Sequence, residues 1–386
     1  MIAVALIAVV TILTYGFWKN RQLADQRDRL LINFNRAIEH SGRRIQHAGQ
    51  STDDLLRDEL KFLTAIREQT GTEDEVRYER AKAARMSGDI LRKLGEMQAA
   101  QQAYSQAMEE LHWLMIDEKQ SLVYPWDQAS VLNGQGQLAA DEGRLEVAAK
   151  DYQAAIDIYT KLHERAGTNT DAAQQRASVE SNLAIVLGRM GKTTEAIAHH
   201  ERLLKLREDL LTVDPQNPQY HRDHAIALGG LAAAILRSRP KEAENFLVEA
   251  LREVDQLPSI IQSEQLVREF RAAAHGNLAI VLNKRSALVE GQAEYKKALE
   301  IMQKLVSSYP DVIRYEQGVA DIHNNLAFML AGDGNFQLAI KNMEAAAKGY
   351  ASLAAKHPET ATFRDEQLRL EGLLKELKES AKAGTP

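Results

Sequence analysis

Cysteine is absent from this chain of 386 residues, and proline is scarce, with 8 residues. The absence of cysteine excludes disulfides and thiolate-based zinc sites, but it does not fix the cellular compartment. Few prolines and no run of alternating β-branched residues favour an almost wholly helical chain. The net charge is −6, and no dense stripe of Lys and Arg is interleaved with aromatic residues. These two features argue against nucleic acid as the main ligand.

A turn position recurs six times along the chain, at steps of 47 or 48 residues. Each turn closes one predicted helix and is followed by a second. Register held through six units is the sequence signature of a repeat architecture, in which each unit buries its core against its neighbours. The six positions are Gly95, Gly143, Gly191, Ser238, Ser286 and Gly334.

In the helix that follows each turn, three positions keep the same kind of residue from one repeat to the next. The fifth is small, the ninth is large and the twelfth is small or apolar, so the three lie on one face of the second helix. Small residues allow a neighbouring helix to approach closely. The fifth positions are Ala100, Ala148, Ala196, Ala243, Gly291 and Ala339. The ninth are Tyr104, Tyr152, His200, Leu247, Tyr295 and Met343, and the twelfth are Ala107, Ala155, Leu203, Ala250, Ala298 and Ala346.

This pattern resembles the tetratricopeptide repeat family, whose second helix carries a small residue, an aromatic residue and another Ala at this spacing. The usual period is about 34 residues, so the step here implies roughly 14 extra residues per unit. Longer paired helices accommodate them. The resemblance implies an all-α fold, a right-handed α-solenoid of helix-turn-helix repeats, with a long-repeat variant of the unit.

The chain is expected to divide into four parts. Residues 1–18 are a transmembrane anchor, 19–72 a juxtamembrane helix and N-terminal cap, 73–358 six repeats and 359–386 a C-terminal capping helix and tail. Such caps keep the ends of a solenoid soluble.

Local signals add detail to this division. A short helix is expected at about residues 53–69, and Thr72-Glu-Asp-Glu75 fits a capping box for the first repeat. In the fourth repeat, Gly229-Gly230 and Arg239-Pro240 predict an irregularity or hinge.

Residues 1–18 form an uncharged apolar run that is just long enough to span a bilayer. Tyr15 and Trp18 stand where interfacial aromatics belong, and Lys19 and Arg21 follow. A cleaved signal peptide is the alternative, but the basic residues before the run and the small-x-small site after it are missing. We therefore expect a single-pass membrane protein. The basic flank predicts cytoplasmic repeats, whereas a receptor-like arrangement would place them in the periplasm or outside the cytoplasm.

Two short motifs imitate enzyme signatures without their partners. Gly191-Lys192-Thr193 is similar to the end of a phosphate-binding loop, but Val186 stands where that loop needs Gly. His221-Arg222-Asp223 is similar to a kinase catalytic loop, but Leu228 replaces the metal-binding Asn. His221 and His224 lie one helical turn apart without a third ligand and are interpreted as packing residues. We predict no catalytic residue, no cofactor and no metal site.

Three asparagines, Asn182, Asn277 and Asn325, each lie nine residues before their turn, on the first helix of the unit. In the family that the chain resembles, this helix lines the concave side, and some members use an Asn column to bind a peptide backbone. An amide that donates and accepts suits this role. Alternatively, each Asn binds a neighbouring helix and fixes the register between repeats. His275 and His323, two residues before their Asn, are candidates for the same surface.

The leading interpretation is a membrane-anchored, non-catalytic scaffold whose groove binds a protein or peptide rather than a small molecule. A wider similarity covers nearly the whole chain. The apolar run, a basic helix, the segment 33–37 and the repeat segments 309–315 and 320–327 resemble the region after the kinase domain in bacterial transmembrane Ser/Thr protein kinases. This resemblance implies the sensor or docking half of a kinase whose catalytic domain is absent from the chain. An assembly factor for a membrane complex is a third possibility.

Overall fold

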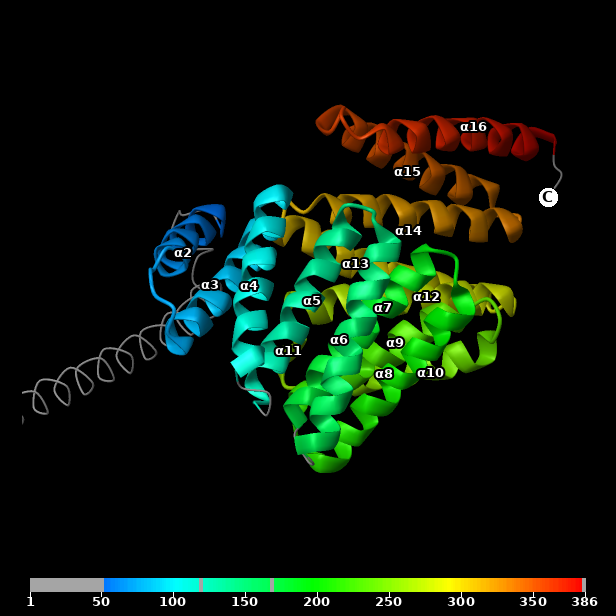
Figure 1. The fold of residues 1–386 in the computed structure, drawn as a ribbon. Helices are drawn as coiled ribbons and strands as arrows, with labels where there is room; N and C mark the ends of the chain where they lie inside the picture. Colours follow the sequence, from blue (N-terminus) through cyan, green and yellow to red (C-terminus); the bar gives the residue numbers. More distant parts are fainter. Residues whose placement is uncertain (1–51, 118–120, 167–169, 384–386) are drawn as a thin grey trace, which may run out of the picture. The chain divides into compact units, whose positions relative to one another are not determined.

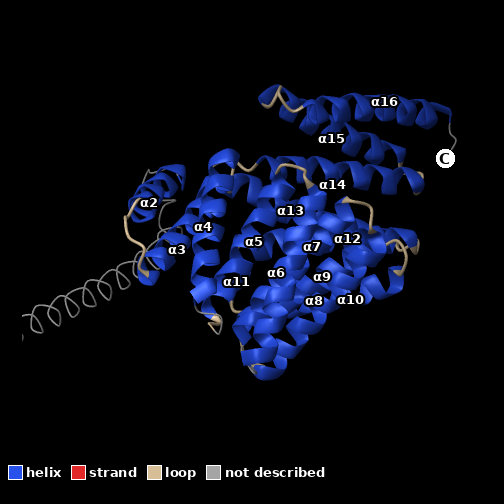
Figure 2. Ribbon diagram, in the orientation of Figure 1, coloured by secondary structure: helices blue, strands red, loops and turns tan. Residues whose placement is uncertain are grey.

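The computed structural model describes residues 52–117, 121–166 and 170–383, and all regular secondary structure in these ranges is α-helical (Figure 2). The expected all-α fold is confirmed. Figure 1 shows the helices, which are α2 (Thr52–Arg67), α3 (Asp74–Lys93), α4 (Met97–Asp117), α5 (Val123–Asp141), α6 (Leu145–Ala166), α7 (Thr170–Arg189), α8 (Thr193–Val213), α9 (Pro218–Ile235), α10 (Pro240–Gln256), α11 (Ser259–Gln262), α12 (Gln265–Lys284), α13 (Leu288–Ser308), α14 (Ile313–Gly332), α15 (Phe336–Lys356) and α16 (Ala361–Ala383).

The chain forms two compact units, Met1–Lys119 and Gln120–Pro386. Among the described residues of the first unit, α2 packs on α3, and α3 packs on α4. In the second unit, helices α5 to α10 and α12 to α16 each pack on the next of them along the chain, and the short α11 contacts α9 and α12. This pattern of neighbour contacts is that of a helical repeat solenoid.

No helix within residues 52–117, 121–166 and 170–383 is long and apolar enough to cross a membrane. This finding contradicts the single-pass membrane location expected from the sequence. The expected placement of the repeats on one side of a membrane depended on that location and falls with it. The stretch 1–18, from which the expectation came, and the helix expected at 19–48 lie outside the described residues.

The recurring turns share one backbone conformation. Gly95, Gly143, Gly191 and Gly334 have φ between +74° and +77°, and Ser286 has φ +59°. A left-handed residue after a helix lets the following amides bond back to the last carbonyls, which ends the helix. At the first turn, for example, the amide of Glu96 donates to the carbonyl of Leu91 at 2.9 Å. The repeated turn positions therefore mark real helix ends.

The expected irregularity in the fourth repeat is present only at its turn. Ser238 is not left-handed, and the turn between α9 and α10 is one residue longer than the others. By contrast, α9 runs without a break through Gly229 and Gly230. The capping box predicted at Thr72 is wrong, because Glu73 is the N-cap of α3 and makes no side-chain capping bond.

Replacing Ser286 with Gly is expected to raise the free energy of unfolding by about 0.5–1 kcal/mol. A residue with a Cβ costs about 1–2 kcal/mol in the left-handed region, and the extra freedom of Gly in the unfolded chain offsets part of the gain. Urea denaturation of Ser286→Gly measures the effect. The matched control, Ser238→Gly, has no left-handed strain to relieve and should lose stability. Stabilisation of both variants would contradict this explanation.

The small, large and small positions of the second helices are buried in all six helix pairs. The side chains of Tyr104, Leu247 and Ala298, for example, are fully covered. Because these positions recur at the same offsets from each turn, every second helix presents the same packing face to its neighbours. The predicted core face is thus confirmed.

Candidate functional site

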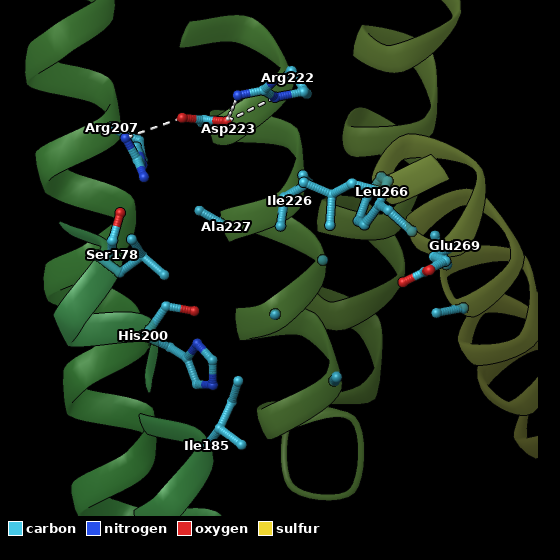
Figure 3. Close-up of a pocket in the computed structure, with 18 of the residues that line it drawn as sticks. Ser178, Ile185, His200, Arg207, Arg222, Asp223, Ile226, Ala227, Leu266 and Glu269 are labelled. Atoms are coloured by element: carbon cyan, nitrogen blue, oxygen red, sulfur yellow. Dashed lines mark hydrogen bonds and ion pairs between the residues drawn. The ribbon is translucent and has the colours of Figure 1, made fainter. Parts of the chain in front are cut away.

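The first helices of three successive pairs, α7, α9 and α12, border a cavity of about 750 Å³ (Figure 3). The second helix α8 closes it with His200, Leu203 and Arg207. A second cavity of about 440 Å³ adjoins it, and we call the two together the groove. Both cavities are lined by Ile185, His200, Gly230, Ala233 and Asn277.

Large apolar side chains in the groove are open to solvent. Ile185 on α7 is 54% exposed and Leu266 on α12 is 51% exposed, and both line the first cavity. Ile226 on α9 and Phe270 on α12 are half-buried beside them. Exposed apolar side chains gathered in a concave site indicate a binding surface.

Each charged side chain that lines the first cavity has a partner of opposite charge. Arg207 Nη1 lies 3.2 Å from Asp223 Oδ2, and Arg222 Nη2 lies 2.8 Å from Asp223 Oδ1 (Figure 3). Arg222 also binds Glu264 at 3.0 Å. At the α12 side, Glu269 accepts from Arg314 at 2.7 Å. Since the charges of the first cavity are paired, that cavity presents little unbalanced charge, and its apolar and amide groups remain for a ligand.

His200 and Arg207 each keep one buried nitrogen, Nδ1 and Nε, without a hydrogen-bond partner among the described residues. His200 is 8% exposed. Burial, assisted by the neighbouring His199, lowers the pKa of His200 to about 4. The imidazole is therefore neutral at pH 7. An unpaired buried polar atom costs about 1–3 kcal/mol, so this position in the groove requires an explanation.

Two of the predicted asparagines lie in the groove. Asn182 lines the first cavity and Asn277 lines both. Asn182 Nδ2 also donates to Asn133 Oδ1 on α5 at 3.1 Å, so this amide joins two successive first helices while it borders the groove. Asn325 lies on α14 and is not among the lining residues of either cavity.

The two predicted histidines bind the second helix of their own pair. His275 Nδ1 donates to Glu294 Oε2 at 2.5 Å, and His323 Nδ1 donates to Asn342 Oδ1 at 2.9 Å. The equivalent contact in the third pair joins His199 to Glu180 at 2.6 Å. Burial lowers the pKa of His275, although Glu294 opposes the shift. These histidines therefore connect the helices of a pair and do not line the groove.

The histidines expected to be packing residues share one carboxylate. His221 Nδ1 and His224 Nδ1 donate to the two oxygens of Glu253, each at 2.8 Å. Hydrogen bonding to Glu253 raises the pKa of His221. Within the described ranges no group of three or more His, Asp or Glu side chains is placed to hold a metal ion. The contact joins α9 to α10.

Sequence reasoning missed the apolar groove residues and His200 as a groove residue. The sequence does contain a recurring pattern for some of these apolar residues. Ile185, Ile280 and Phe328 each follow their Asn by three residues, which places them one helical turn away on the same side of the helix. Ile185 and Ile280 line the groove, and Phe328 is 49% exposed on α14. No comparable pattern marks Leu266 or Phe270.

Comparison with known proteins supports the repeat assignment. Residues 85–110, 177–217 and 285–311 match family models described as tetratricopeptide repeat. No curated protein sequence matches the chain. The chain therefore contains tetratricopeptide repeats. Domains of this class generally bind protein or peptide partners and are generally non-catalytic scaffolds.

The chain also matches solved structures. The apo form of RapI has 14% sequence identity and a TM-score of 0.52, over 79% of this chain and 97% of that one. BtubC (BKLC) from P. vanneervenii has 20% identity and a TM-score of 0.49, over 65% and 89%. The pilF protein of Pseudomonas aeruginosa has 15% identity and a TM-score of 0.40, over 76% and 99%. At these identities the likeness to RapI shows the fold alone. The resemblance to kinase-linked repeats and the long-repeat variant stay predictions.

Proposed function

We propose that this chain is a non-catalytic scaffold whose groove on α7, α9 and α12 binds an extended segment of a partner protein. The observation that carries the proposal is the exposure of Ile185 and Leu266 inside a concave site, where unpartnered apolar surface is otherwise unfavourable. In this proposal residues 73–358 supply six repeat units, and residues 359–386 cover the last of them.

The groove suits an extended peptide in length and in chemistry. The groove residues on α9 run from Arg222 to Ala234, a distance of about 18 Å at 1.5 Å per residue. About five residues of extended peptide cover that distance at 3.3 Å each. The amides of Asn182 and Asn277 donate and accept, which matches the backbone groups of an extended chain, and the apolar side chains receive alternate residues of the ligand.

Ile185→Asp is expected to weaken binding of a groove peptide by at least about tenfold, because it places a charge in the apolar part of the groove. The measurement uses the full chain and a displayed library of random twelve-residue peptides. A selected peptide is then labelled and titrated by fluorescence anisotropy. Val248→Asp is the matched control, since Val248 is 51% exposed on α10 and does not line the groove.

Selected peptides should bind the Val248→Asp chain as they bind the unchanged one. A library that yields no binder, or binders equally weakened by both substitutions, would contradict the proposal. Asn182→Ala combined with Asn277→Ala tests the amides separately. Loss of affinity there, with an unchanged circular dichroism spectrum, supports backbone recognition.

A further inference from the structure

The packing pattern of the second helices changes at His200. The ninth position after the turn is Tyr in the first, second and fifth pairs, and the rings of Tyr104 and Tyr152 are buried against Gly88 and Gly136 of the first helix of their own pair. In the third pair the smaller imidazole of His200 stands there and lies against Gly230 of the next pair. His200 is one of the five residues that line both cavities of the groove. The groove thus lies at a repeat whose ninth position carries a smaller ring than tyrosine.

The contacts of His200 define what it offers to a ligand. A Cβ added at Gly230 would lie 3.3 Å from Nδ1, so the α-hydrogen of Gly230 occupies the space in front of this nitrogen. A lone pair on Nδ1 tolerates that neighbour better than an unpaired N–H does. This arrangement favours the tautomer with its proton on Nε2, which donates to an oxygen. Figure 3 shows the ring pointing from α8 toward Ile185.

Ser178 supplies a second polar group in the same cavity. Its hydroxyl donates to the carbonyl of Gln174 at 3.1 Å, which leaves its oxygen free to accept a hydrogen bond. Apolar side chains near His200 include Ile185, Ile226 and Leu203, and the amides of Asn182 and Asn277 also line the cavity. A ligand group that matches the apolar side chains and Nε2–H has an apolar body and a tip that accepts a hydrogen bond.

We propose that the bound segment inserts a tyrosine side chain into the groove beside His200, with its ring between Ile185 and Ile226 and its hydroxyl bonded to the imidazole. The phenol oxygen accepts from Nε2–H. Phenylalanine fills the same space but leaves Nε2–H unpaired, and the indole of tryptophan only donates. A charged side chain of the ligand would find no unpaired charge of opposite sign at Arg207 or Asp223, because these two residues bind each other. This inference rests on the proposed function and adds the identity of one ligand residue.

N-acetyl-tyrosinamide and N-acetyl-phenylalaninamide test the preference directly. Titrated into the full chain and followed by saturation-transfer NMR, the tyrosine probe is expected to bind about tenfold more tightly, the difference that one hydrogen-bonded hydroxyl supplies. His200→Tyr introduces the residue of the first, second and fifth repeats and fills the space, so it should abolish binding of both probes while the thermal unfolding midpoint is retained. His200→Leu, which carries the residue of the fourth repeat, should bind both probes equally.

Equal affinity of the two probes for the unchanged chain would overturn the proposal, as would binding that survives His200→Tyr or no binding at all. Failure of the proposed function would give different results from failure of the tyrosine proposal. Displayed peptides that are sensitive to Ile185→Asp but carry no tyrosine would overturn this inference and leave the peptide groove intact. Tyrosine-probe binding that depends on His200, without any displayed peptide, would establish the pocket and contradict the peptide-binding role.

Discussion

Lowering the pH from 7 to 4.5 is expected to cost the folded chain about 2 kcal/mol through His200 alone. The pKa of this imidazole is about 4 in the folded chain, because the ring is buried and lies near His199. In the unfolded chain it takes the ordinary value of about 6.5. The unfolded state therefore binds a proton between pH 6.5 and 4 that the folded state does not. The stability is present above pH 6.5 and is lost as the pH falls toward 4.

Carboxylates and other histidines also titrate in this range, so the quantity to measure is a difference between proteins. The free energy of unfolding from urea titrations at pH 7 and at pH 4.5 is compared for the unchanged chain and for His200→Gln. The variant should lose about 2 kcal/mol less between the two pH values. Ile156→Val is the control, since it weakens a buried contact and keeps the imidazole. Its loss should equal that of the unchanged chain, and an equal loss in His200→Gln would refute the assignment.

The contact among His221, His224 and Glu253 responds to pH in a different window. Burial acts to raise the pKa of Glu253, but the hydrogen bonds from His224 and His221 outweigh it and leave this pKa lowered. The pKa of His221 is raised. The carboxylate contributes stability above pH 4.5 and loses it as the pH falls through its folded pKa, whereas His221 contributes below pH 6.5 and loses it as the pH rises. Their shared contribution is therefore largest between about pH 4.5 and 6.5, where His200 weakens the fold.

The sequence predicted the repeat unit because its determinants are local and periodic. Left-handed turn residues and the small, large and small positions have fixed offsets, and a helix converts each offset into a fixed direction. The groove depends on how successive pairs are arranged, and this arrangement is not encoded in any single unit. Thus Asn182 was identified by its recurrence, while Leu266 and Phe270 became groove residues only through the position of α12 beside α9.

The histidine prediction shows the limit of recurrence as an argument. His275 and His323 recur like the asparagines, but two residues along a helix turn a side chain by about 200°. That rotation directs them to the second helix, where Glu294 and Asn342 bind them. Recurrence indicated that the position matters, and the helical angle decided which neighbour it contacts.

Gly136→Ala is expected to lower the free energy of unfolding by about 1–3 kcal/mol, although alanine favours helix over glycine by about 1 kcal/mol. A Cβ at position 136 would lie 2.7 Å from a ring carbon of Tyr152, and that ring is 2% exposed. A contact this short forces the ring or the helix to move. Because Tyr152 is enclosed on its other sides by the core, the ring has little room to turn away.

Gly276→Ala is the matched comparison, since Gly276 also lies inside a long helix, α12, and a Cβ there meets nothing within 4 Å. It should gain about 0.5–1 kcal/mol from helix propensity alone. Opposite signs for the two substitutions, measured by urea denaturation, would separate packing from propensity. Adding Tyr152→Leu to Gly136→Ala should then cost less than Tyr152→Leu costs alone, because the new methyl group fills part of the space that the ring vacates. If Tyr152→Leu costs the same with and without Gly136→Ala, the strain caused by Gly136→Ala does not lie at the ring of Tyr152.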